Sequence, residues 1–327
     1  MHKYLNPKNY LRYFLNRFAG LASIALQPVE NYLGQKYGDK GIKNYPPVFI
    51  IGAPRCGSTL LYKILTERFK FSYFSNFTAK FYKIPICGTL LQKILGIRVR
   101  TGGYNFNYGQ VEGLGSPNEC GEFWYRWFPR GMHIYVAPDQ IPAVNLKELR
   151  AEIGGISAVT KRPVIFKNLY NSMRIAPIVE AMPEAVFIVC KRDYLNNALS
   201  ILKGREIHMG DKKKWMGTPP KEIDKLLDLS NEKQVVGQVY YIYQQIKEDL
   251  IRFGKQRFYE VSYEKFCSDI HSSVELIENF LLSEGCSLEK RDKIPKRFQA
   301  MGVDGIHPDD RKMVAKAVQN LIRPNNK

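Results

Sequence analysis

Residues 47–65, which read PVFIIGAPRCGSTLLYKIL, decide the fold of this chain. The apolar run ahead of Gly52 is rich in β-branched residues and predicts a buried strand of a parallel sheet. After a Gly-Ala-Pro turn, leucines and isoleucines recur at helical spacing from Ser58 onwards. Strand, loop and helix together form a phosphate cradle, because the first N–H groups of the helix point into the loop and the helix dipole adds positive charge there.

The loop nearly matches the triphosphate-binding pattern G-x-x-x-x-G-K-[ST]. Gly52 and Gly57 have the required spacing, but Ser58 stands where the lysine belongs. The charge that this lysine brings to the β- and γ-phosphates is missing, and Arg55 supplies a cation from within the loop instead. A P-loop kinase for a nucleotide or small molecule is therefore an alternative that Ser58 argues against.

The bulk composition is that of an ordinary globular protein, with 327 residues of which 45% are hydrophobic. No clear linker divides the chain, so we expect a single domain over residues 1–327. Lysine and arginine (49) exceed aspartate and glutamate (31), and the net charge of +18 favours an anionic ligand or surface. A basic nucleic-acid-binding protein is the second alternative, but no binding module supports it and we expect no nucleic-acid partner.

The six cysteines are scattered, and no pair has the C-x-x-C spacing of a zinc or redox site, which indicates a reducing, cytoplasmic compartment. Near the start of the chain, residues 10–26 combine apolar and aromatic side chains with Arg12 and Arg17, and they are too short of apolar residues to span a bilayer. We expect residues 1–45 to form an amphipathic helical extension, which packs on its own domain or lies peripherally on a membrane. Its end, residues 34–47, is rich in glycine and proline and predicts a loop.

A glycine-rich stretch, residues 98–118, carries Tyr104, Phe106 and Tyr108 and predicts a long loop. Loops of this length often form a lid or a substrate-binding segment. The aromatic side chains suit stacking on sugar rings, and packing over the protein's own core explains them equally well.

The segment SPNECGEFWYRWF, residues 116–128, places Glu119 and Glu122 just ahead of an aromatic cluster. A carboxylate beside apolar aromatic surface can have a raised pKa, which suits a general base. Either glutamate also suits the start of the following helix, where negative charge is favourable. The spacing alone leaves both interpretations open.

Two further predicted strands end in basic residues. Residues 162–167 end in Lys167, and residues 185–193 end in Lys-Arg-Asp, which includes Arg192. Ligands of open α/β sheets bind beyond the carboxyl ends of the strands, so Lys167 is placed to meet a transferring anionic group, although a solvated lysine is equally compatible. Ser200 lies on the next helix, and an arginine and a hydroxyl in this arrangement can bind one phosphate.

In order along the chain, these elements resemble the PAPS-dependent sulfotransferases, which use 3′-phosphoadenosine 5′-phosphosulfate (PAPS), in their bacterial form. The resemblance covers residues 47–269 and rests on the loop around Arg55, the strand end at Lys167, the Arg192–Ser200 pair and the strand end at Tyr263. It implies a P-loop-like three-layer α/β fold with a central parallel sheet and helices on both faces.

The resemblance also implies roles for single residues. The phosphate loop would hold the 5′-phosphosulfate, Arg192 and Ser200 would hold the 3′-phosphate, and Lys167 would steady the bridging oxygen as the sulfuryl group leaves. A Pro-x-Glu pattern of bacterial members places Glu119 ahead of Glu122 as the base. The implied donor-binding residues are Arg55, Cys56, Gly57, Ser58, Thr59, Leu60, Arg192 and Ser200. The implied catalytic residues are Glu119, Lys167 and Arg55.

The chain departs from the cytosolic detoxifying members of the family in two places. Asn168 and Leu169 follow Lys167 where those members have a histidine base, and their C-terminal Arg-Lys-Gly loop has no counterpart. The basic residues 211–225, with Trp215, would cover the donor instead. The reaction needs no metal, because arginine and lysine can stabilise a leaving sulfuryl group. Basic surface and aromatic loops favour a glycan or glycolipid hydroxyl as the acceptor.

Overall fold

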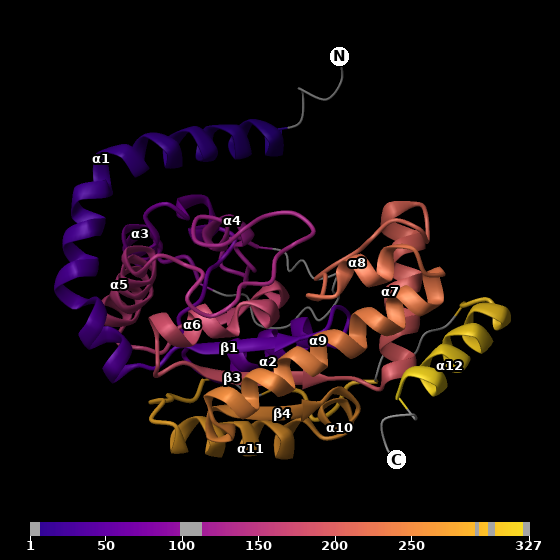
Figure 1. Ribbon diagram of the computed structural model, residues 1–327. Helices are drawn as coiled ribbons and strands as arrows, with labels where there is room; N and C mark the ends of the chain where they lie inside the picture. Colours follow the sequence, from indigo (N-terminus) through magenta and orange to yellow (C-terminus); the bar gives the residue numbers. More distant parts are fainter. Residues whose placement is uncertain (1–6, 99–112, 292–293, 300–304, 323–327) are drawn as a thin grey trace.

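A computed structural model describes residues 7–98, 113–291, 294–299 and 305–322. Its centre is a four-stranded parallel sheet with the order β2-β1-β3-β4 (Figure 1). The strands are β1 (Val48–Gly52), β2 (Ile165–Lys167), β3 (Val186–Lys191) and β4 (Phe258–Ser262). The predicted α/β class with a central parallel sheet is confirmed, and the phosphate loop follows β1 directly.

Helices cover both faces of the sheet. One face packs on α2 (Ser58–Arg68), α10 (Tyr263–Ser268) and α11 (Ile270–Ser283). The other face packs on α4 (Gly121–Trp124), α5 (Ala143–Thr160), α6 (Ile175–Ala181), α7 (Tyr194–Met209) and α9 (Asn231–Phe253), and α12 (Pro308–Ile322) joins the same core. The remaining elements are α1 (Pro7–Asn44), η2 (Thr78–Phe81), α3 (Pro85–Ile94), η3 (Leu169–Met173), α8 (Ile223–Leu227) and η4 (Lys255–Arg257).

Strand alternation explains why the sheet is buried on both sides. Val48 and Ile50 of β1 enter the core on the α2 side, whereas Phe49 and Ile51 enter the core on the α9 side. Phe49 also belongs to a row of stacked rings that crosses all four strands at centroid separations of 5.1, 5.5 and 4.9 Å. The row consists of Phe166, Phe49, Phe187 and Phe258. This row of rings specifies the register of the four strands, because a slip by one residue would move a strand's ring to the opposite face of the sheet.

The prediction of a loop over residues 34–47 is wrong for most of that stretch, since α1 continues to Asn44. The glycines serve close helix packing rather than turns. A Cβ on Gly38 would lie 2.7 Å from the Cα of Ala151 on α5, and a Cβ on Gly41 would overlap the backbone of Gly154. The glycine content of this stretch therefore led to the prediction of a loop. In the structure the same glycines allow the backbones of α1 and α5 to approach closely.

Candidate active site

The phosphate loop has the backbone shape of an anion cradle. Arg55 has a φ of 65° and Gly57 a φ of 95°, so the chain reverses sharply before α2 begins at Ser58. A Cβ on Gly57 would overlap the ring of Tyr263, the first residue of α10. The loop therefore requires glycine at this position for its conformation and for its close approach to the ring.

Neighbouring elements hold the loop by hydrogen bonds to its backbone. The Ser172 hydroxyl accepts from the N–H of Gly52 and donates to its carbonyl oxygen, both at 3.0 Å. The Asn197 side chain on α7 donates to the carbonyl oxygen of Pro54 at 2.6 Å. Sequence reasoning missed both residues, because Ser172 lies 120 positions from its partner and no motif marks it.

The structure brings together the three residues that were predicted to hold the donor's anionic groups. Arg192 follows β3 and donates from Nη1 to the carbonyl oxygen of Arg55 at 3.1 Å. Arg55 in turn donates from Nε to the Ser200 hydroxyl at 3.3 Å. The Arg192 guanidinium lies over the Tyr263 ring, 5.0 Å from its centroid. Two cations and a hydroxyl thus gather beside the loop, which is a donor set suited to phosphate groups.

Lys167 and Glu119 meet at the carboxyl edge of the sheet. Lys167 ends β2 and pairs in register with Ile50 of β1, next to the phosphate loop. Its buried ammonium group forms an ion pair with the Glu119 carboxylate, whose side chain is 42% exposed. The Asn168 side chain also donates to the Glu119 carbonyl oxygen at 3.3 Å. A half-exposed carboxylate and a buried cation are therefore held together at the end of the strand next to β1 and its loop.

Glu122 lies in a different setting. It occupies the first turn of α4, and its carboxylate pairs with Arg130 at 2.6 Å on the exposed surface. The residue that caps α4 is Cys120, so Glu119 does not cap the helix. Glu119 therefore contacts Lys167, whereas Glu122 lies at the solvent-exposed surface with Arg130.

Two tyrosine rings lie together in this region, Tyr125 directly after α4 and Tyr170 on η3, and no sequence pattern marks them. Tyr125 and Tyr170 are half-buried, with ring centroids 6.2 Å apart, and burial raises the pKa of Tyr170. Beneath them lies the fully buried guanidinium of Arg174, whose Nε and Nη1 have no hydrogen-bond partner among the described residues. Burial lowers the pKa of Arg174 to about 10. The exposed Arg130 guanidinium also lies over the Tyr125 ring, 4.4 Å from its centroid.

The basic residues 211–225 pack onto the phosphate loop at one point. A Cβ on Gly217 would lie 2.7 Å from the Pro54 ring. Trp215 stacks under the Arg205 guanidinium at 4.9 Å and donates from Nε1 to the carbonyl oxygen of Gly217. Of the predicted acceptor loop, residues 99–112 lie outside the described part of the chain.

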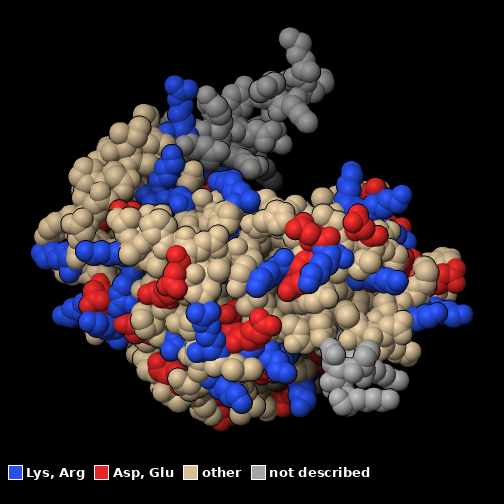
Figure 2. Space-filling model, in the orientation of Figure 1, with Lys and Arg blue, Asp and Glu red and all other residues tan. Residues whose placement is uncertain are grey.

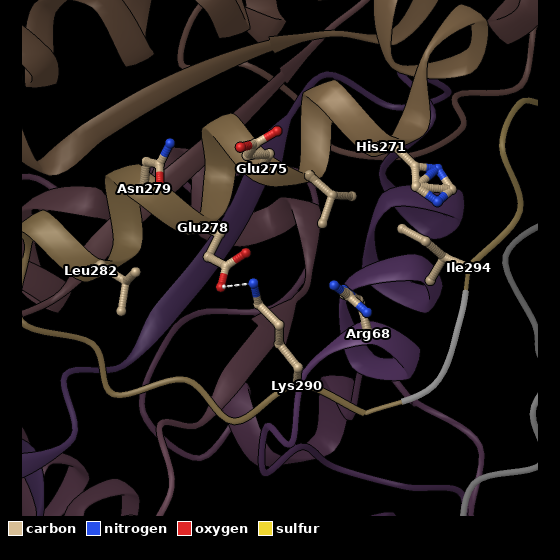
Figure 3. Close-up of a pocket in the computed structure, with 9 residues that line it drawn as sticks. Arg68, His271, Glu275, Glu278, Asn279, Leu282, Lys290 and Ile294 are labelled. Carbon is tan, nitrogen blue, oxygen red and sulfur yellow. Dashed lines mark ion pairs between the residues drawn. The ribbon is translucent and has the colours of Figure 1, made fainter.

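A pocket of about 450 Å³ lies away from this site, between the end of α2 and α11 (Figure 3). Arg68 and Lys290 face His271 and Glu275 across it, and Lys290 pairs with Glu278 at 3.0 Å. None of the predicted site residues lines this pocket, because the phosphate loop precedes the opposite end of α2. In the described ranges we find no cluster of His, Cys, Asp or Glu that could hold a metal ion.

The fold and the loop define a P-loop-like α/β protein in which two arginines and a lysine gather at the carboxyl edge of the sheet. A model of the sulfotransferase family matches residues 46–284, and the chain belongs to that family. No curated protein sequence matches the chain at a significant level.

Solved structures similar to this chain include three bacterial sulfotransferases. Sulfotransferase STF9 from Mycobacterium avium has 13% sequence identity and a TM-score of 0.48, over 74% of this chain and 66% of that one. STF1 from Mycobacterium tuberculosis has 10% identity and a TM-score of 0.45, over 94% and 79% of the two chains. A sulfotransferase from Alicyclobacillus acidocaldarius has 18% identity and a TM-score of 0.40, over 85% and 96%.

Proposed function

We propose that the protein transfers a sulfuryl group from PAPS to an acceptor hydroxyl, with Glu119 as the general base. The observation that carries this proposal is the Lys167–Glu119 ion pair. Lys167 ends β2, which is the neighbour of β1 and therefore lies beside the phosphate loop. Membership of the sulfotransferase family indicates the class of reaction. The ion pair supplies a carboxylate for the acceptor hydroxyl and a cation for the oxygen that leaves sulfur.

The donor's two anionic ends match the cations at the loop. The first N–H groups of α2 and the Arg55 side chain hold the 5′-phosphosulfate, while Arg192 and Ser200 hold the 3′-phosphate. The loop residues that line this cradle are Arg55, Cys56, Gly57, Ser58, Thr59 and Leu60. No lysine is needed in the loop, because the donor has no γ-phosphate.

Glu119 takes the proton of the acceptor hydroxyl as the acceptor oxygen attacks sulfur in line. A new S–O bond forms, the bond from sulfur to the phosphate oxygen breaks, and 3′-phosphoadenosine 5′-phosphate (PAP) leaves. Lys167 neutralises the charge on that departing oxygen. Lys167 pairs with Glu119 in the structure, so a move of the ammonium group to the leaving oxygen would free the carboxylate to accept the proton. The protein's own cations carry out this charge stabilisation, so the proposal includes no metal.

A glycan or glycolipid hydroxyl is the acceptor that we propose. Besides burial, the charge of Glu119 contributes to the raised pKa of Tyr170, and the Tyr125 ring lies 6.2 Å from that of Tyr170. Half-exposed rings of this kind can stack on a sugar face. We also propose that the protein acts in the cytoplasm. In support, all six cysteines are buried and unpaired, as is usual in a reducing compartment.

Titration calorimetry with PAP and AMP in magnesium-free buffer tests the donor assignment. Charge-assisted hydrogen bonds contribute about 1.5–3 kcal/mol each, so PAP should bind about 10–100-fold more tightly than AMP. Arg192→Ala should remove most of this preference and lower AMP affinity only a few-fold, because Ser172 and Asn197 still support the loop that Arg192 also contacts. Lys70→Ala removes a cation from an exposed ion pair with Glu289 and serves as the matched control. Equal affinities for PAP and AMP in the wild-type protein would overturn the assignment.

A further inference from the structure

Helix α1 has two halves that contact the molecule differently. It contains Pro28, and Figure 1 shows it bent, with the second half beside α5 and the first half extending over the body of the molecule. Proline bends a helix because it removes a backbone hydrogen bond and clashes with the preceding turn. We call residues 17–29 the arm.

The arm is fixed to the body through small residues. Ala19 and Ser23 are its buried side chains, and Ala19 joins a small apolar cluster with Phe77 and Phe81. Glu30 anchors the end of the arm, because its buried carboxylate accepts the N–H groups of Ile86 and Cys87, each at 2.8 Å, at the start of α3. The orientation of the arm is therefore set by contacts with η2 and α3.

The large apolar side chains of the arm face outward. Leu21 is 65% exposed, Ile24 is 77% exposed and Phe18 is 48% exposed, and Val29 also lies on the surface. This pattern inverts the usual one, in which large apolar residues pack inward and small ones face solvent. A contiguous exposed apolar surface of this kind marks an interaction site.

The charge of this region indicates what covers it. Within residues 1–38 the only acidic residue is Glu30, which is buried, whereas Lys3, Lys8, Arg12 and Arg17 precede it. Figure 2 shows the part of α1 at the upper left as mainly uncharged surface with basic side chains beside it. None of the helices in the described ranges has the length and hydropathy that a membrane span requires.

We propose that the arm docks in the interface of a membrane that contains anionic phospholipids, with Phe18, Leu21 and Ile24 in the acyl boundary, and that the positive charge of the sequence ahead of Glu30 favours anionic headgroups. Apolar side chains on one face together with cations are the features by which helices bind in the plane of a membrane. A second copy of the chain fits less well, because a symmetric contact would bring two basic arms together.

Co-sedimentation with vesicles tests this surface separately from catalysis. Wild-type protein should bind vesicles of phosphatidylcholine with 30% phosphatidylglycerol, bind pure phosphatidylcholine at least tenfold more weakly, and lose affinity as salt is raised. The double variant Leu21→Glu/Ile24→Glu should lose at least tenfold in affinity for the anionic vesicles. Ile251→Glu/Leu276→Glu makes the same charge change at exposed residues of α9 and α11, and it should bind within twofold of wild type.

Circular dichroism and PAP binding establish that each variant is folded, and neither readout involves the lipid. Equal vesicle binding by the two double variants would overturn the proposal. It would also be overturned if light scattering showed a wild-type dimer that Leu21→Glu/Ile24→Glu converts to a monomer, since the arm would then cover a second copy.

Discussion

The proposed donor side of the site, around the phosphate loop, is built differently from the proposed acceptor side, around Glu119. On the donor side, Ser172, Asn197 and Arg192 from three separate segments bind the backbone of the phosphate loop. On the acceptor side, Glu119 lies on an irregular segment, and half-exposed rings replace the dense hydrogen bonding. A donor shared across a family needs one fixed geometry, whereas acceptors vary, and variable recognition is commonly built on loops around a rigid scaffold.

The largest effect on activity is expected from a change at Glu119, which pairs with Lys167 beside the phosphate loop. Glu119→Gln should lower kcat by about 10²–10⁴-fold, because the amide cannot take the acceptor proton. PAP affinity should stay within a few-fold of wild type, since the loop contacts are untouched. Transfer of ³⁵S from labelled PAPS into a host-cell extract measures the first effect and calorimetry the second.

Glu122→Gln is the control for this variant, because Glu122 pairs with Arg130 at the surface. It should retain most of the wild-type activity. An active Glu119→Gln variant together with an inactive Glu122→Gln variant would transfer the role of base to Glu122.

Gly57→Ala should break the donor side alone. The added Cβ overlaps the Tyr263 ring, and the left-handed backbone conformation costs about 1–3 kcal/mol for a residue with a side chain. We expect PAP affinity to fall about 100-fold. Gly131→Ala is the matched control, since Gly131 has the same φ of 95° but open space around its Cα, and it should bind PAP as tightly as wild type. Equal losses of PAP affinity in both variants would mean that general destabilisation of the protein, rather than the overlap with the Tyr263 ring, lowers PAP binding.

Tyr125→Ala tests the acceptor side. Loss of the ring should raise KM for the acceptor about tenfold, because a stacking surface beside Tyr170 disappears, while PAP affinity stays unchanged. Tyr125→Phe retains the ring and should restore KM. The measurement is steady-state kinetics with the acceptor identified from the labelled product. A fall in PAP affinity for Tyr125→Ala would show that the two sides are not separate.

The sequence predicted the central fold and the gathering of cations at the phosphate loop better than the contacts that support them, for physical reasons. A parallel strand, a glycine-containing loop and the basic ends of neighbouring strands are local patterns, so the α/β fold and the meeting of Arg55, Arg192 and Ser200 could be anticipated. Contacts such as Ser172 with Gly52 depend on the tertiary fold and leave no local pattern. The same limit explains the error in α1, where glycines selected for close packing on α5 were interpreted as turn residues.

Ser172→Ala should give the smallest effect and would show how much the loop depends on its supports. The Ser172 hydroxyl is fully buried, and its loss leaves the N–H and the carbonyl oxygen of Gly52 without this partner. A buried unsatisfied group costs about 1–3 kcal/mol, so urea unfolding should show a loss of stability in that range. PAP affinity should fall only a few-fold, because Asn197 and Arg192 still hold the loop. A loss as large as that of Gly57→Ala would mean that the supports act as one unit, and the donor side would then be less robust than its number of contacts suggests.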